Sequence, residues 1–190
     1  IEESKMYNYK ALFILAIALL YSFSKAQSEW ISFSDEFDGI DTKPQFSLLM
    51  STDTEIIINI KISGMLSNNI QIDNKIYQQL IIPGGGKNRE IGNPELPTVG
   101  KFIEIPYGVK PKISVTNSKF KVLEGYNIYP VQEEQMDSDN QQTKFVKNDI
   151  MYSTDAFYPE QVVILEQPHI LRGHRIALIH QYPVQYLSLI

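Results

Sequence analysis

The chain contains no cysteine. No disulfide can therefore stabilise the fold, and no cysteine can act as a nucleophile or as the lipidated residue of a lipoprotein. Positive charge is also scarce, because 17 Lys and Arg residues face 22 Asp and Glu residues and leave a formal net charge of −5. An acidic chain is repelled by phosphate backbones, so we expect no nucleic-acid partner.

Motifs for nucleotide binding and hydrolysis are missing as well. Residues 83–86 contain three successive glycines before Lys87. A Walker A loop needs a glycine at the position of Ile81 and a serine or threonine at that of Asn88, so this stretch predicts only a flexible turn. The chain has no Gly-x-Ser-x-Gly elbow and no arrangement typical of a Ser-His-Asp triad. The residues therefore predict a non-catalytic chain without a small-molecule cofactor.

Two groups of residues resemble metal ligands only loosely. The histidines have spacings that match no closed zinc site, so partly exposed, uncoordinated side chains are favoured. The acidic residues lack the regular Asp-x-Asp-x-Asp-Gly loop, so calcium is the less favoured alternative there. The two groups are His169, His174 and His180, and Asp35, Glu36, Asp38 and Asp41.

The N-terminal region has the three parts of a secretory signal peptide. Lys10 precedes an apolar run over residues 11–21, and Ser24 and Ala26 then supply a small-x-small ending. This pattern predicts a signal peptide over residues 1–26, with cleavage between Ala26 and Gln27. The run is shorter than the roughly 20 residues that span a bilayer and lacks a basic stop-transfer cluster, so a retained anchor is the alternative.

We interpret Met6 as the true start and residues 27–190 as one exported domain. Its end, residues 187–190, is apolar and strand-like, and we interpret it as a C-terminal truncation. The export machinery is thus an expected partner. Small exported eukaryotic modules often use disulfides, so their absence favours a bacterial protein, secreted or held at the cell envelope.

The exported region predicts short strands separated by turns. Ile58, Ile60 and Ile62 alternate with polar residues, as in a half-buried strand, and Asp73-Asn74 suits a hairpin turn. With no convincing amphipathic helix, we predict an all-β, antiparallel, β-sandwich-like single domain preceded by a signal-peptide helix. The predicted strands cover residues 55–62, 69–72, 75–82, 101–105, 112–116, 119–123, 161–165 and 175–182, and a turn at 172–174 joins the last two.

Two further segments predict irregular structure. Residues 83–97, rich in glycine and proline, predict a long loop. Residues 132–143 are polar, acidic and nearly free of apolar side chains, which predicts a mobile surface loop. A solvated connector and a segment that contacts another polypeptide both remain open for this second stretch.

The most specific motif lies where the first of these loops ends. It consists of Gly92, Asn93, Pro94, Glu95, Leu96 and Pro97. Two prolines around an acidic-apolar pair force an extended, rigid passage, and the predicted strand that follows ends at Pro106-Tyr107-Gly108. This arrangement resembles the propeptide domain of the gingipain-type secreted cysteine peptidases, the clan with a caspase-like catalytic domain.

The resemblance extends over roughly residues 55–186 as an ordered set of shorter matches. Leu187 and Ser188 stand where many members have Asn-Pro, so the end of the domain departs from the family pattern. The other matches are residues 62–64, 70–77, 80–83, 129–132, 148–149, 152, 157–159, 172–175 and 182–186.

The resemblance implies a β-sandwich that covers the active-site cleft of a following peptidase domain. Such a propeptide assists folding and keeps the enzyme latent until proteolysis removes it. The implied partner is the cognate cysteine peptidase domain, in cis or in trans. Binding to the native enzyme stabilises it by mass action, and covalent linkage raises the effective concentration.

We predict that the polar segment at residues 132–149 enters that cleft. Lys144 and Lys147 are its only basic residues, so either is a candidate to mimic a substrate side chain, and ordinary surface lysines are the alternative. A secreted β-sandwich module for binding or adhesion is the second reading, since a fold alone does not fix a function. A self-contained enzyme is the least favoured, because the nucleophile and the metal ligands are missing.

Overall fold

The computed structural model describes residues 28–33, 43–134 and 144–188. The predicted signal peptide with its cleavage site at Ala26-Gln27, the acidic group at residues 35–41 and residues 135–143 of the polar segment lie outside these residues. In the described parts, no helix is both long enough and apolar enough to cross a membrane.

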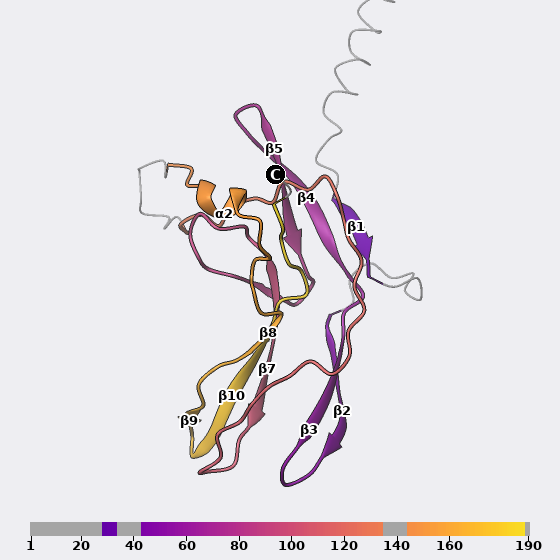
Figure 1. The fold of residues 1–190 in the computed structure, drawn as a ribbon, viewed down its shortest axis with the longest axis vertical. Coiled ribbons are helices and arrows are strands. Elements are labelled where there is room, and N and C mark those ends of the chain that lie inside the picture. Colours follow the sequence, from indigo (N-terminus) through magenta and orange to yellow (C-terminus); the bar gives the residue numbers. More distant parts are fainter. Residues whose placement is uncertain (1–27, 34–42, 135–143, 189–190) are drawn as a thin grey trace, which may run out of the picture.

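The regular elements of the described chain are strands, apart from a short helix near the polar segment (Figure 1). The strands are β1 Glu29–Ser32, β2 Gln45–Ser51, β3 Ile56–Lys61, β4 Gly64–Ile72, β5 Lys75–Ile81, β6 Gly86–Lys87, β7 Pro97–Glu104, β8 Val163–Leu165, β9 His169–Leu171 and β10 His174–Gln181, and the helix is α2 Asp149–Ser153. All paired strands are antiparallel, so the predicted all-β, antiparallel fold is confirmed.

The first sheet has the strand order β1-β4-β5. Strands β4 and β5 form the predicted hairpin, with Ile72 opposite Lys75 and Asp73 at a φ of 51° in the turn. Aspartate tolerates this left-handed conformation better than most residues, which explains why the turn was recognisable in the sequence.

The second sheet has the order β6-β7-β10-β8, and β9 also pairs with β10. The predicted strands at 161–165 and 175–182 do pair, as β8 and β10. The turn at Arg172 and Gly173, with φ values of 51° and 85°, joins β9 to β10 rather than β8 to β10. The prediction missed β9 because its three residues carry no periodic pattern.

The main core lies between these two sheets. Met65 and Leu80 come from β4 and β5 and Val99 from β7, and they pack in one buried cluster with Leu96. Two sheets that bury their apolar faces against each other make a sandwich, as predicted. The remaining buried members of the cluster are Ile31, Ile82 and Ile128.

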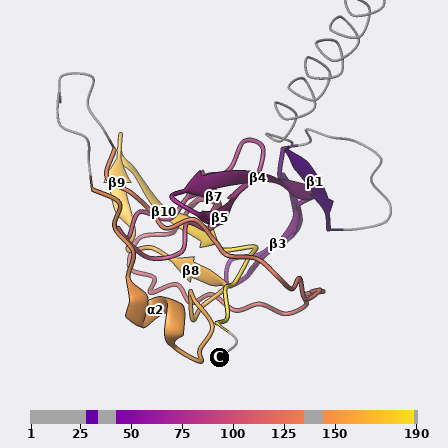
Figure 2. The ribbon, with the colours of Figure 1, turned by 90° about the horizontal axis from the view of Figure 1, so that it is seen from above.

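A two-stranded sheet, β2-β3, extends from this body. Its β3 was predicted, whereas β2 was not, although Phe46 and Ile60 from the pair reach the core cluster. Beyond them Leu48 and Leu49 are exposed. Figure 1 shows this hairpin at the same end of the molecule as the β9–β10 turn, and both views place α2 and β1 on opposite sides (Figure 2).

Two predictions about local structure were wrong. Residues 112–116 and 119–123 form no strand, because no described chain segment pairs with them; in Figure 1 this stretch runs without an arrow from the end of β7 past β2 and β3. Residues 83–97 are not one irregular loop, since β6 pairs with β7 and both Asn88 and residues 92–97 are buried. Proline and glycine there fix an ordered path.

Candidate functional site

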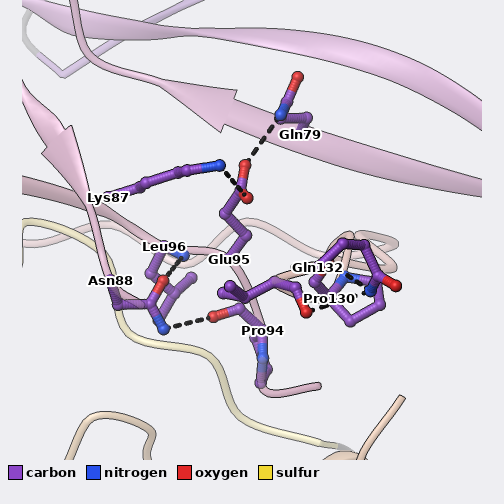
Figure 3. Close-up of polar contacts among 9 residues, drawn as sticks. Gln79, Lys87, Asn88, Pro94, Glu95, Leu96, Pro130 and Gln132 are labelled. Carbon is purple, nitrogen blue, oxygen red and sulfur yellow. Dashed lines mark hydrogen bonds and ion pairs between the residues drawn. The ribbon is translucent and has the colours of Figure 1, made fainter. Parts of the chain in front are cut away.

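The Gly92–Pro97 motif is buried along its whole length. The carboxylate of Glu95, whose side chain is only 3% exposed, accepts hydrogen bonds from Lys87 Nζ at 2.8 Å and Gln79 Nε2 at 2.8 Å (Figure 3). A buried carboxylate is tolerated only where such partners compensate its lost hydration. Glu95 therefore ties β5 and β6 to the motif.

Asn88 fixes the path of the motif from the side. Its Oδ1 accepts from the backbone N–H of Leu96 at 2.8 Å, and its Nδ2 donates to the carbonyl of Pro94 at 2.9 Å. Proline has no N–H, so a passage with two prolines cannot pair as a regular strand, and a side-chain amide satisfies its remaining backbone groups instead. The same Nδ2 contacts the hydroxyl of Tyr158 at 2.9 Å.

Residues 129–132 run beside the motif in antiparallel fashion. The N–H groups of Glu95 and Gly92 donate to the carbonyls of Tyr129 and Val131, both at 2.8 Å. On its other side this segment bonds to Gln78 of β5, through the Tyr129 N–H at 2.9 Å. Two short matches that lie far apart in the sequence thus form one strip of backbone between the sheets.

The polar segment leaves the body from Gln132 and returns at Val146. The Gln132 side chain joins these points, because its Nε2 donates to the Val146 carbonyl at 2.7 Å and its Oε1 accepts from the Val146 N–H at 2.8 Å. We call this pair of hydrogen bonds the Gln132 clasp. Phe145, next to the clasp, packs against the rings of Tyr77 and Tyr129 at centroid distances of 5.6 and 6.1 Å.

Asn148 connects the returning chain to the motif. Its N–H donates to the carbonyl of Gly92 at 2.9 Å, and its Nδ2 donates to Oδ1 of Asn93 at 2.8 Å. Its Oδ1 also accepts from the Met151 N–H at 3.4 Å and caps α2. Gly92 has a φ of 82°, and a Cβ there would lie 3.2 Å from the Asn148 nitrogen, so this close approach requires glycine.

The two candidate lysines have different surroundings. Lys144 is exposed immediately before Phe145. Lys147 is folded back onto the domain: its Nζ lies 4.4 Å from the ring centroid of Tyr152 and 3.5 Å from Oδ1 of Asp149, and its side chain is 27% exposed. The structure therefore leaves Lys144 free to extend and holds Lys147 in a cation–π contact.

Several tyrosines lie around the motif and the residues that fix the polar segment to it, and their hydroxyl groups stay protonated. Burial raises the pKa of Tyr152 far above its ordinary value, with Tyr186 and Tyr77 adding to the rise, and its hydroxyl donates to the Ile128 carbonyl at 2.7 Å. Burial also raises the pKa of Tyr158, whose hydroxyl donates to Glu90 Oε2 at 2.8 Å. These groups act as hydrogen-bond donors rather than acids at neutral pH.

Sequence reasoning found the motif but missed the polar residues that hold it. Asn88 and Glu90 lie in the stretch predicted as a long loop, and Gln132 is the first residue of the stretch predicted as a mobile surface loop. The one signal available was at Asn148, where Asn followed by Asp is typical of a helix start. The predicted histidines stay apart: His174 contacts Glu104 at 2.9 Å and His180 lies 3.6 Å from Glu166.

Among the described residues, no cluster of three or more His, Asp or Glu side chains has the arrangement of a metal site. What the geometry does provide is a two-sheet β domain with a polar segment fixed at both ends to a buried motif. The sequence profile of the Propeptide_C25 family matches residues 38–189, and the chain belongs to this family. It is therefore a propeptide domain, as predicted.

Similar proteins come from Porphyromonas gingivalis. Lys-gingipain is 32% identical over 116 residues, which cover 58% of this chain and 7% of the relative. Gingipain R2 is 24% identical over 144 residues, 75% of this chain and 19% of the relative. The chain thus spans only a small part of the length of these relatives.

Two solved structures have a similar fold. One, reported on the zymogenic latency of gingipain K from Porphyromonas gingivalis, has a TM-score of 0.68 at 24% identity and covers 85% of this chain and 89% of that chain. The other, the complex of RgpB pro- and mature domains from the same organism, has a TM-score of 0.69 at 23% identity, with 76% and 75% covered.

Proposed function

We propose that this chain is the N-terminal prodomain of a gingipain-like cysteine endopeptidase, and that it assists the folding of the peptidase domain and keeps it latent. The observation that carries the proposal is the fixation of both ends of the polar segment, through the Gln132 clasp and Asn148, to the buried family motif. A segment that is fixed at both ends loses less conformational entropy on binding, as an inhibitor requires. The fold likeness to a structure reported on the zymogenic latency of gingipain K, and to the complex of RgpB pro- and mature domains, supports the same role.

We propose Lys144 as the side chain that enters the peptidase cleft. It is exposed, and its neighbour Phe145 is fixed against two tyrosine rings. Lys147 is the second candidate, because it must first leave its contact with the ring of Tyr152. The name of the Lys-gingipain relatives refers to lysine, which favours a lysine side chain as the ligand of the cleft.

We also propose that the precursor is exported from a bacterial cell. Residues 1–26 would then act as the signal peptide, with Met6 as the start and residues 27–190 as the exported domain, secreted or held at the cell envelope. Mass spectrometry of the exported product should place its N-terminus at Gln27. An N-terminus at Met6 on an exported product would contradict this proposal.

The function is tested by adding the purified chain to the mature peptidase domain of the same precursor and measuring residual activity on a peptide substrate. We expect saturable inhibition by the wild-type chain and at least about a tenfold higher inhibition constant for Lys144→Ala, since a buried charged anchor is worth more than about 1.4 kcal/mol. Lys147→Ala is the matched control and should change inhibition less. Absence of inhibition by the wild-type chain would refute the prodomain role, and unchanged inhibition by the Lys144→Ala/Lys147→Ala double variant would refute only the role of the lysines.

A further inference from the structure

Residues 112–123 have the sequence pattern of a β-hairpin. Ile113 and Val115 alternate with polar residues before Asn117-Ser118, and Phe120 and Val122 do so after it. With Asn117 and Ser118 as a two-residue turn, Val115 faces Phe120 and Ile113 faces Val122 across the strands. All four apolar side chains then lie on one face, because paired residues in a hairpin point to the same side.

The structure leaves this pattern unused. No strand covers residues 109–124, and within the described chain no backbone hydrogen bond joins residues 110–124 to another backbone group. Phe120 is 91% exposed, Val122 76% and Val115 47%. A two-stranded hairpin with an uncovered apolar face is marginal in water, which explains why the segment remains extended here. Exposed apolar side chains next to unpaired backbone groups are typical of an interaction surface.

The charge of the segment indicates the chemistry of its partner. It carries Lys110, Lys112, Lys119 and Lys121, and no acidic residue lies between Glu104 and Glu124, although the chain as a whole is acidic. One of these ammonium groups, that of Lys121, donates to the carbonyl of Ser32. A basic strip around an apolar face fits an apolar surface with an acidic rim.

One part of the segment lies near α2, the helix that follows the polar segment. A cleft of about 920 Å³ is lined by residues of this segment, among them Ile113 and Val115, together with Met151 and Phe157. Met151 belongs to α2, the helix that follows Lys144 and Lys147 directly in the chain. The segment therefore extends from the cleft beside α2, through Ile113 and Val115, to β1, where Lys121 contacts Ser32.

We propose that residues 112–123 are a second docking element, which folds into a β-hairpin when its apolar face is covered by an acid-rimmed apolar surface of the peptidase domain. This inference rests on the proposed function, since it names a second contact with the same partner. Folding on binding costs ordering entropy, which the burial of four apolar side chains offsets. Affinity and inhibition would then depend on different segments: the hairpin contributes binding energy away from the active-site cleft of the peptidase, and the polar segment blocks that cleft.

Hydrogen–deuterium exchange, read by mass spectrometry, tests the folding step. The chain is measured alone and with the mature peptidase domain of the same precursor, inactivated at its nucleophile. We expect unprotected exchange of residues 112–123 in the free chain and at least about tenfold slower exchange in the complex, as hydrogen bonding of a formerly open segment requires. Protection already present in the free chain at low concentration would overturn folding on binding.

Paired variants test the surface. Phe120→Ser/Val122→Ser should weaken binding to the peptidase domain at least about tenfold. Burial of each apolar side chain stabilises the complex by more than about 1.4 kcal/mol, which corresponds to a factor of ten in the dissociation constant. Ile170→Ser/Leu171→Ser, two exposed apolar residues of β9, is the matched control and should bind like wild type. Lys112→Glu/Lys119→Glu should weaken binding and flatten its dependence on salt. Unchanged melting temperatures would show that the variants act on the surface and not on the fold.

The outcomes separate this inference from the proposed function. If the wild-type chain does not bind the peptidase domain, the proposed function fails and the inference with it. If it binds while residues 112–123 stay unprotected and Phe120→Ser/Val122→Ser has no effect, the inference alone is overturned. Protection that appears in the chain alone only at high concentration would assign the segment to a second copy of the chain and would equally overturn it.

Discussion

Glu95 accepts from the ammonium group of Lys87 and Glu104 contacts the imidazole ring of His174, but only Glu95 is buried. Its side chain is 3% exposed, against 66% for Glu104 in its pair with His174. Loss of one partner of a buried pair costs about 3–5 kcal/mol. Lys87 is 47% exposed and regains hydration when its partner is removed, so we expect a smaller loss.

Glu95→Ala should therefore lower the free energy of unfolding by about 2 kcal/mol, because Lys87 and Gln79 lose charge-assisted hydrogen bonds. Glu104→Ala is the control and should change the free energy of unfolding by less than about 0.5 kcal/mol, since contacts between exposed polar side chains contribute little. Urea unfolding followed by circular dichroism measures both. Equal losses in the two variants would show that burial of Glu95 does not matter to stability.

Tyr152 should make the domain sensitive to alkaline pH. Burial raises its pKa in the folded state above the unfolded value of about 10, so the folded state keeps a proton that the unfolded state releases. The unfolded state then binds fewer protons above pH 10, and stability falls as the pH rises through that value. Tyr152→Phe should cost about 1 kcal/mol at pH 7, from the lost hydrogen bond to Ile128, and should reduce the alkaline decline in melting temperature. If the melting temperature of Tyr152→Phe falls with pH as steeply as that of the wild type between pH 9 and 11, Tyr152 is not the cause of the alkaline decline.

At the scale of elements, the Gln132 clasp joins Gln132 and Val146 through one side chain, which bonds to both backbone groups of Val146. Gln132→Ala removes both hydrogen bonds to Val146 and should ease local opening by about 1–2 kcal/mol, which corresponds to about 5–30-fold more of the open state. Tryptic cleavage after Lys144 should accelerate accordingly, because proteolysis follows local opening.

The control for the clasp is Gln185→Ala. Gln185 donates to the Pro159 carbonyl at 2.8 Å and so makes a comparable bond elsewhere. It should leave cleavage after Lys144 unchanged. Gln132→Glu should be intermediate, since a carboxylate still accepts from the Val146 N–H but cannot donate to its carbonyl. Equal cleavage rates in all three variants would show that the clasp does not restrain the segment.

The elements that the sequence predicted are those with a period of two or a turn residue of special conformation. The alternating isoleucines of β3 and Asp73 in the β4–β5 turn are examples, and the motif was visible because its prolines restrict the backbone. Its supporting contacts were not predictable, because Asn88, Gln132 and Asn148 act through tertiary hydrogen bonds that no local pattern encodes. Residues 112–123 show the converse: a local pattern without a tertiary surface to complete it produces no strand.

At the scale of the whole molecule, one backbone strip joins β5, the edge strand of the first sheet, to the buried motif that leads into β7. Residues 127–131 bond to β5 on one side and to the motif on the other, and Ile128 belongs to the core cluster. The polar segment begins at Gln132, directly after residues 127–131. The first described residues of the segment are therefore attached to a strip that contributes Ile128 to the core cluster.

The proposed function leads to a prediction about the stability of the peptidase domain. A chain that binds only the native peptidase domain stabilises it by RT ln(1 + [L]/Kd), about 2.7 kcal/mol at a chain concentration of 100 Kd. Adding the chain in trans should therefore raise the melting temperature of the inactivated peptidase domain, with a rise that grows with the logarithm of chain concentration. The Gln132→Ala chain should require a higher concentration for the same rise in melting temperature, because its polar segment loses more conformational entropy on binding. Inhibition of the active enzyme without any thermal stabilisation would mean that the chain binds folded and unfolded peptidase alike, and would exclude an assisting role in folding.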